Sequence, residues 1–479
     1  MTRWHDTQSD APVAEAVERF LADPGAAFTT PGHKRAAWLD DALLARDLPL
    51  ATGADDNQLS NGVLLRSEAL AAELWGADVC RFSVSGSTHG NQALCLAVGA
   101  PGARVAVSRT VHKSTFAGLV LAGLSPVWMH PDVDPVSGLA AGLRLDELRR
   151  ALDQDVAAVI VVEPSYVGVL SNLPEIAAAA HAAGAPVIVD QAWGSHLGLH
   201  PALPANALQM GADAMVMSAH KTLTAFTQGA LAFLRGDLVD RDRFASGFDA
   251  LNTTSPSAAI YGSLDESRRL MALRGEELLG RTLALAAGFR QQMADVEGLW
   301  VLDGRLSDSQ PSVFDIDPLK LVITLAGTGA SGFDVERDLL EAGVRLEMAD
   351  RETLVPLLTI GDDERTVGRL TDALKRSVER RRSTPRETSS STVWRLRPET
   401  AMDPRDAFFA PRERVSADRA VGRICAETAA PYPPGIPALA PGEVISAELL
   451  EGLRAEAAAG SRIAYCSDPS LQTVLVVAS

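Results

Sequence analysis

One lysine and one aspartate stand where two predicted strands end. Lys221 lies shortly after the apolar run Ala214–Met217, and Asp190 directly follows the run Pro186–Val189. Open α/β sheets place their ligands at the carboxyl ends of strands, so both side chains should reach one edge of a sheet. An amine that forms a Schiff base and an acid that keeps a pyridine nitrogen protonated are what pyridoxal phosphate requires.

Each of these two residues also has an ordinary interpretation. An aspartate at a strand end often caps the next helix, and a lysine there is often a surface charge. However, five successive predicted strand ends carry polar side chains, which independent capping explains poorly. These side chains are Ser87 and Thr88, then His112, Ser165 and Asp190, and finally Ser218, His220 and Lys221.

The segment Ser85–Asn91 reads Ser-Gly-Ser-Thr-His-Gly-Asn and lies between a predicted strand and a predicted helix. Small residues let backbone amides approach a phosphate, the hydroxyls of Ser87 and Thr88 can donate to it, and the helix amino terminus adds partial positive charge. The motif favours a phosphate site, although Ser and Thr are equally ordinary helix caps.

Two further basic segments leave alternatives open. His112 follows a predicted strand, and it could stack on an aromatic cofactor or cap the helix Ser114–Ala122; taken singly, the cap is favoured. The loop Thr29–Arg35 presents His33 and Lys34 after a Pro-Gly turn. Without other information, a solvated turn is the favoured interpretation of that loop.

The elements that must position these residues alternate between strand and helix. This alternation predicts an α/β large domain with a mainly parallel sheet. The predicted strands are Arg81–Val84, Ala103–Val107, Pro126–Met129, Ala157–Val162, Pro186–Val189 and Ala214–Met217. The predicted helices are Pro12–Ala22, Ser67–Trp75, His89–Val98, Ser114–Ala122, Leu145–Leu152 and Leu173–Ala183.

After the large domain, the pattern predicts a helix over Glu266–Met293, a smaller α+β domain and a carboxy-terminal α+β module. The prolines of Tyr432–Pro437 favour a rigid loop within that module. The expected boundaries are an amino-terminal segment 1–60, a cofactor-binding large domain 61–265, a linking helix with the small domain 266–382, a linker 383–392 and the module 393–479.

Composition limits the classes of function. The 479 residues carry 44 basic and 61 acidic side chains, and the net charge of −17 disfavours non-specific nucleic-acid binding. No secretory signal or membrane-length apolar run is visible, so we expect a cytoplasmic protein with no membrane partner. The cysteines Cys80, Cys95, Cys425 and Cys466 show no CxxC spacing, which predicts reduced structural thiols and no metal site.

The motifs together resemble the ornithine, lysine and arginine decarboxylase family of fold-type-I pyridoxal phosphate enzymes, in its short bacterial form without an amino-terminal wing domain. Such a fold is similar to that of aspartate aminotransferase. The matching stretches are TPGHK (30–34), SGSTHGN (85–91), HKS (112–114), EPSYVGV (163–169), VIVDQAWGSH (187–196), SAHKTLTAFTQGA (218–230), LNTTSPSAAIYGSLD (251–265), EMAD (347–350) and PYPPGIPALAPGE (431–443). They occur in the family's order along nearly the whole chain.

The resemblance implies a role for individual residues. Lys221 is expected to hold pyridoxal 5'-phosphate as a Schiff base, and Asp190 to pair with the pyridinium nitrogen. The other implied cofactor contacts are ring stacking by His112, phosphate binding by Ser87, Thr88, Ser218 and His220, and contact with the 3-hydroxyl side by Trp193. Either His220 or Lys221 would return a proton to the α-carbon.

The resemblance also implies a homodimer with shared active sites, because Ser255 lies in a segment that reaches the partner's phosphate site in this family. A higher oligomer is also compatible with it. For the cationic side chain of a substrate, the candidates are the acids Glu347, Asp350 and Glu443. His33 is a further candidate for binding the substrate. Such acids equally often hold a fold together through neighbouring arginines.

The implied activity is decarboxylation of a basic amino acid to the corresponding amine and carbon dioxide, a reaction of polyamine biosynthesis. Arginine is the first expected substrate, then lysine or ornithine. Gln191 and Trp193 depart from the His-like residues that many short members carry after the strand aspartate, and this departure affects the choice of substrate. The alternatives are aldol cleavage or transamination on the same scaffold, or a non-catalytic family member.

Overall fold

The computed structural model describes residues 6–22, 47, 62–134, 139–386, 393, 395–432 and 435–478. The chain divides into two compact units. The first comprises Met1–Ala97 and Ile188–Gly280, and the second comprises Val98–Val187 and Arg281–Ser479. None of the described helices has the length and apolar character needed to span a bilayer.

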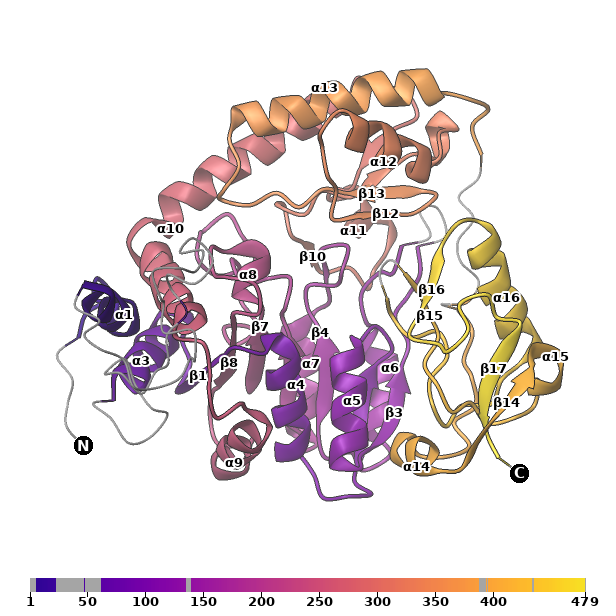
Figure 1. The fold of residues 1–479 in the computed structure, drawn as a ribbon, viewed down its shortest axis with the longest axis horizontal. Coiled ribbons are helices and arrows are strands. Elements are labelled where there is room, and N and C mark those ends of the chain that lie inside the picture. Colours follow the sequence, from indigo (N-terminus) through magenta and orange to yellow (C-terminus); the bar gives the residue numbers. More distant parts are fainter. Residues whose placement is uncertain are drawn as a thin grey trace, which may run out of the picture. The chain divides into compact units, whose positions relative to one another are not determined.

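Seven strands form the main sheet in the order β1-β8-β7-β6-β4-β2-β3 (Figure 1). Their bounds are β1 Val79–Ser83, β2 Arg104–Ser108, β3 Ser125–Met129, β4 Val159–Val162, β6 Val187–Asp190, β7 Ala214–Met217 and β8 Ala230–Leu234. The pairs β2–β3, β2–β4 and β6–β7 are parallel, whereas β8 is antiparallel to both of its neighbours. The mainly parallel α/β sheet predicted from the sequence is therefore confirmed.

Strand β8 was missed by the sequence prediction. It is fully buried and follows β7 after only the short helix α8, Ala219–Thr222, so no long crossover helix separates the two strands. An antiparallel strand needs no such crossover, which is why the strand–helix alternation did not reveal it. The apolar run between Gly229 and Gly236 was the available signal.

Helix α4 holds the first unit's strands together. It packs on β1, β7 and β8 and on helix α9. A Cβ at Gly90 would lie 2.9 Å from Cγ1 of Val216, so only glycine lets α4 approach β7 this closely. The helices of this unit begin and end at α1 Pro12–Ala22, α3 Val63–Trp75, α4 Gly86–Ala97, α8 Ala219–Thr222 and α9 Arg241–Leu251.

The long helix α10 runs over Ala258–Met293, so its predicted start at Glu266 was wrong. The first turns contain Ile260, Tyr261 and Gly262, which are weaker helix formers than Ala, so the local sequence did not reveal this part of the helix. Within α10, Asp265 forms a fully buried ion pair with Arg268 at 2.6 Å. The Asp265 carboxylate also accepts the Val13 N–H at 2.9 Å, which fixes α1 to this helix.

In the second unit, helix α6 packs on β2 and β3 and against helix α7. A four-stranded antiparallel sheet, β12-β13-β11-β9, carries helix α12 and forms the smaller α+β part. The remaining bounds are α5 Lys113–Ala122, α6 Leu145–Leu152, α7 Leu173–Ala182, β5 Val169–Leu170, β9 Trp300–Val301, α11 Arg305–Ser309, β10 Asp315–Ile316, β11 Ile323–Thr324, η2 Ala326–Thr328, α12 Gly332–Glu341, β12 Met348–Ala349, β13 Thr353–Val355 and α13 Glu364–Arg381.

The carboxy-terminal module has its own buried apolar core. Two antiparallel strand pairs, β14–β17 and β15–β16, are covered by short helices. The bounds are α14 Pro404–Phe409, β14 Arg412–Ser416, α15 Ala417–Ala420, β15 Ala430–Tyr432, α16 Ala447–Ala458, β16 Arg462–Ala464 and β17 Thr473–Val477. This arrangement confirms the predicted α+β module.

Candidate active site

Lys221 and Trp193 lie together in the first unit. Lys221 sits on α8, the short helix that starts immediately after Ser218 at the end of β7. Its Nζ stands 4.1 Å from the centroid of the Trp193 ring. An ammonium over the face of an indole is attracted by the ring quadrupole, by about 0.5–2 kcal/mol depending on exposure. The contact holds the amine of Lys221 on the side of Trp193.

Asp190 ends β6 and is 3% exposed. One carboxylate oxygen accepts the Ala192 N–H at 3.1 Å, and the other accepts the side-chain amide of Asn91 at 2.7 Å. The Asp190–Asn91 bond fixes the direction of a buried carboxylate. Strands β6 and β7 are parallel neighbours with Asp190 opposite Val216, so Asp190 and α8 belong to adjacent strand ends.

Asn91 is the residue of this cluster to which the sequence analysis gave no role. It is buried on α4 and comes from the last position of the Ser85–Asn91 motif. Ser87 lies one helical turn before it, at i and i+4, so the two side chains share a face of the helix. That spacing could have placed Asn91 on the helix face of Ser87, although it does not reveal the contact with Asp190.

The predicted phosphate residues have different surroundings. Ser87 and Thr88 occupy the first turn of α4 and are half-buried, next to Gly86 with φ of 73°. Ser218 is 1% exposed, and its hydroxyl has no hydrogen-bond partner among the described residues. A buried hydroxyl without a partner is costly, so this one is suited to bind a polar group that enters the site.

His220 lies beside Lys221 on α8. Its Nδ1 is 3.0 Å from the carbonyl oxygen of Gly229, so Nδ1 carries the hydrogen and donates it. Burial lowers the pKa of His220, and the nearby charge of Lys221 lowers it further. The neutral ring therefore has its lone pair on Nε2.

Gln191, one of the two departures from the family pattern, has an internal role. It is fully buried, its amide donates to the Gly194 carbonyl at 2.8 Å, and its oxygen accepts the Ala207 N–H at 2.8 Å. Both bonds brace the loop that carries Trp193. Gln191 is thus engaged within the loop.

In the second unit, His112 caps helix α5. Its Nδ1 accepts the Ser114 N–H at 3.2 Å, and its side chain is exposed. The capping interpretation is confirmed, and ring stacking by His112 stays a prediction. Ser255 lies on an exposed segment between α9 and α10 in the first unit, and His33 lies outside the described residues.

The three candidate substrate acids, all in the second unit, differ in their partners. Glu443 is 1% exposed and pairs with the Arg109 guanidinium through two bonds of 2.6 and 2.9 Å. Asp350 accepts N–H groups of Glu352 and Thr353, both at 2.7 Å. Glu347 is exposed and has no hydrogen-bond or ion-pair partner within the described part of the chain.

Arg109 and Asp350 line a cavity of about 110 Å³ together with Tyr166. The Arg109 guanidinium also stacks on Trp128, with 4.8 Å between its central carbon and the ring centroid. Burial raises the pKa of the Asp350 carboxyl, and the hydrogen bonds that it accepts oppose that change. Asp350 and Glu443 thus both stabilise local structure in this unit.

Comparisons with known proteins identify the family. The Orn/Lys/Arg decarboxylase major domain matches residues 11–366, and the carboxy-terminal domain of the same family matches residues 387–462. The chain belongs to the Orn/Lys/Arg decarboxylase family. The chain is 34% identical to an arginine decarboxylase of Halalkalibacterium halodurans and 33% identical to one of Bacillus subtilis, each over 98% of both chains.

Solved structures of this decarboxylase family confirm the fold. The constitutive lysine decarboxylase of Escherichia coli matches 98% of this chain and 82% of its own, with a TM-score of 0.80 and 20% identity. Lysine decarboxylase A of Pseudomonas aeruginosa matches 98% of this chain and 80% of its own, with a TM-score of 0.81 and 20% identity. A serine palmitoyltransferase of Sphingomonas wittichii matches 78% of this chain with a TM-score of 0.56, as expected for a fold-type-I scaffold.

Proposed function

We propose that this family member binds pyridoxal 5'-phosphate in its first unit and decarboxylates a basic amino acid, arginine first, to the amine and carbon dioxide. The observation that carries the proposal is the arrangement at two adjacent strand ends. There, the amine of Lys221 lies against Trp193, and the Asp190 carboxylate is fixed by Asn91. Curated relatives at 32–34% identity that are named arginine decarboxylases support arginine as the first substrate.

The side chains of this unit fit the cofactor. Lys221 Nζ would bind the aldehyde carbon, and Asp190 would accept the hydrogen of the pyridinium nitrogen. The partnerless hydroxyl of Ser218 and the first turn of α4, with Ser87 and Thr88, would bind the phosphate. When bound, the cofactor supplies an electron-accepting ring that stabilises the charge left on the α-carbon as carbon dioxide departs.

Lys221 is the better candidate to return the proton to the α-carbon. His220 donates from Nδ1 to a backbone carbonyl, and its lowered pKa leaves Nε2 without a hydrogen near pH 7. A side chain without a hydrogen to give is a poor general acid. The amine of Lys221, when it is not bound to the cofactor, would carry hydrogens and would lie beside the cofactor ring.

Glu347 is the candidate we favour for a cationic substrate side chain. Glu443 and Asp350 are engaged by Arg109 and by backbone N–H groups, and a carboxylate that left those partners would leave buried donors unsatisfied. Glu347 retains an exposed carboxylate. A guanidinium requires an acidic partner at a fixed distance from the reacting carbon.

The test is a substrate panel read by mass spectrometry of the products. Purified protein with pyridoxal phosphate is incubated with arginine, lysine and ornithine, and Lys221→Ala is the matched inactive control. We expect the amine of arginine to form fastest and Lys221→Ala to form none. Formation of a keto acid instead would favour transamination, and the absence of any product with all three amino acids would contradict the proposal.

We further propose a cytoplasmic homodimer, with a role in polyamine biosynthesis. None of the four cysteines, all of which lie in the described part of the chain, forms a disulfide, and disulfides are rare in a reducing compartment. Dimerisation would let the exposed Ser255 of one chain complete the phosphate site of its partner. Sedimentation velocity of the purified protein measures the assembly directly.

A further inference from the structure

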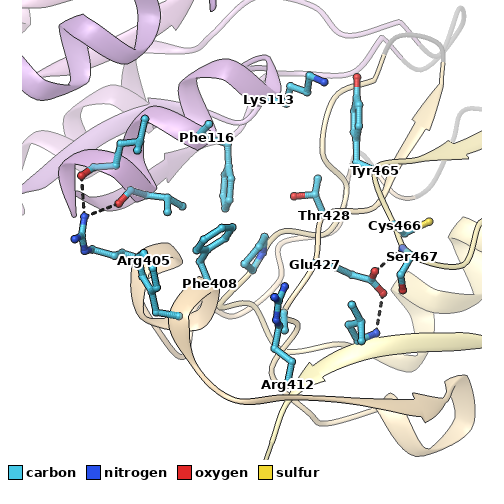
Figure 2. A pocket seen from close by; sticks show the side chains of 17 residues that line it. Lys113, Phe116, Arg405, Phe408, Arg412, Glu427, Thr428, Tyr465, Cys466 and Ser467 are labelled. Atoms are coloured by element: carbon cyan, nitrogen blue, oxygen red, sulfur yellow. Dashed lines mark hydrogen bonds between the residues drawn. The ribbon is translucent and has the colours of Figure 1, made fainter. Parts of the chain in front are cut away.

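A cavity of about 720 Å³ in the second unit lies between α5 and the carboxy-terminal module (Figure 2). Pockets of this volume are typical of small-molecule sites. None of its lining residues is a candidate for cofactor or substrate binding. The cavity therefore represents a feature that the proposed decarboxylation does not use.

Aromatic side chains form much of its wall. Phe116 and Phe408 lie on one side of the cavity, and Tyr465 and Thr428 lie on the other (Figure 2). Phe408 is 48% exposed, and the adjacent Phe409 is 68% exposed. Neighbouring exposed phenylalanines beside a cavity mark a binding surface rather than scattered surface apolar residues. A flat ring would pack well between such walls.

Two cations of the cavity lack an acidic partner. Lys113 holds its Nζ 4.7 Å from the centroid of the Tyr465 ring, and Arg412 points into the cavity (Figure 2). No carboxylate of the described residues lies within ion-pair distance of either side chain. The chain has a net charge of −17, so two such cations at one cavity make its charge opposite in sign to that of the whole chain.

The other charged groups of the lining are already engaged. Arg405 donates to the carbonyls of Val120 and Leu121, at 3.0 and 2.8 Å. The buried carboxylate of Glu427 accepts the N–H groups of Ser467 and Leu475, at 2.6 and 2.7 Å. Glu427 therefore braces the module, and Lys113 and Arg412 remain as the groups available to a ligand.

We propose that this cavity binds a small organic anion with a flat aromatic body. The ring of the ligand packs between Phe408 and Tyr465, and its anionic group pairs with Arg412 and Lys113. A guanidinium and an ammonium bind a carboxylate, sulfonate or phosphate by charge-assisted hydrogen bonds. No residue that lines the cavity is a candidate for binding the cofactor, and the proposal does not depend on the proposed decarboxylation.

The test compares two fluorescent probes of similar shape and different charge. 8-Anilinonaphthalene-1-sulfonate is an aromatic anion, and N-phenyl-1-naphthylamine is its uncharged counterpart. Titrated into full-length protein purified with pyridoxal phosphate, the anionic probe should bind at one site per chain and more tightly than the neutral probe. Arg412→Glu should weaken the anionic probe about tenfold or more and leave the neutral probe unchanged.

Two further variants complete the test. Ala117→Trp fills the cavity from a half-buried position on α5 and should abolish binding of both probes. Arg419→Glu makes the same change of charge at an exposed position outside the cavity and should have no effect. If Ala117→Trp fails to fold, the response of the two probes to Arg412→Glu decides by itself.

Two results would overturn the proposal. The first is anionic probe binding that Arg412→Glu leaves unchanged, since the probe would then occupy another site. The second is the absence of anionic probe binding to the unsubstituted protein. If that absence is accompanied by a change of oligomeric state in Arg412→Glu by sedimentation velocity, the surface is assigned to contact between copies of this chain.

Discussion

At the scale of residues, Asn91 controls the direction of the Asp190 carboxylate. The bond between them is 2.7 Å long and buried, and a hydrogen bond to a charged group of this kind contributes about 1.5–3 kcal/mol. We expect Asn91→Ala to lower kcat at least tenfold and to loosen the cofactor. Asn91→Asp should be worse, because it sets a second negative charge against Asp190.

Activity and cofactor absorbance after dialysis measure both effects. Gln92→Ala, on the same helix and half-buried, is the matched control and should behave as the unsubstituted protein. Full activity of Asn91→Ala would mean that the Ala192 N–H alone is enough to orient Asp190.

Glu163 gives a prediction of pH dependence. It is buried, and burial raises its pKa to about 7, although the Ser171 N–H donates to its carboxylate at 2.9 Å. A carboxyl with a raised folded pKa holds a proton that the unfolded chain releases near pH 4.3, so stability falls as pH rises between about 4.3 and 7. Glu163→Gln cannot titrate and therefore avoids this loss. Its free energy of unfolding, relative to that of the unsubstituted protein, should rise by about 3 kcal/mol between pH 4 and pH 8.

Thermal unfolding midpoints at the two pH values check the sign. Glu175→Gln, an exposed acid on α7, should show no such gain. If Glu163→Gln lowered the unfolding midpoint by the same amount at both pH values, Glu163 would be ionised in the folded protein.

The positions of some candidate residues follow from their local sequence alone. Lys221 and Asp190 each follow an apolar run, so their placement at adjacent strand ends was predictable. The role of Asn91 was missed because it depends on contact with a residue 99 positions away, and the Glu443–Arg109 pair spans 334 positions. Local pattern contains no information on contacts at that separation.

At the scale of elements, strands separated by helices were predicted well, and exceptions had local causes. Each predicted strand of the main sheet exists, with ends that differ by at most a few residues. Strand β8 was missed because its antiparallel connection lacks a crossover helix, and the start of α10 was placed late because Ile260, Tyr261 and Gly262 have weak helix propensity. The hydrophobic pattern predicts strands and helices that alternate regularly along the chain. The prediction fails where the topology departs from that alternation.

Helix α13 tests how much one capping residue contributes. Asp363 accepts the Thr366 N–H at 2.8 Å, and the Thr366 hydroxyl is 3.1 Å from the Asp363 nitrogen and accepts its hydrogen, so the two form a capping box. Asp363→Ala should destabilise the first turn by about 1 kcal/mol and speed amide exchange there about fivefold. Hydrogen exchange by mass spectrometry measures this, with the exposed mid-helix Asp372→Ala as control.

At the scale of the whole molecule, the proposed sharing of active sites between chains makes a quantitative prediction. Lys221 and Ser255 would serve the same site from different chains, so Lys221→Ala and Ser255→Asp should each abolish or strongly reduce activity. In a mixed dimer, one site combines both defects, whereas the other combines an intact Lys221 with an intact Ser255. After random exchange, half of the dimers are mixed, and about a quarter of the sites should be active.

We would mix the two inactive proteins, allow them to exchange subunits and measure the activity that returns. Each protein carried alone through the same exchange is the control. If Ser255 instead serves the site of its own chain, every site in the mixture carries one of the two substitutions, and no activity returns. Ser255→Ala is the milder variant at the same position. Loss of a hydroxyl weakens phosphate binding only modestly, whereas an aspartate repels the phosphate. Recovery with Ser255→Asp that grows with the fraction of mixed dimers would therefore locate this exposed segment at the partner's phosphate site.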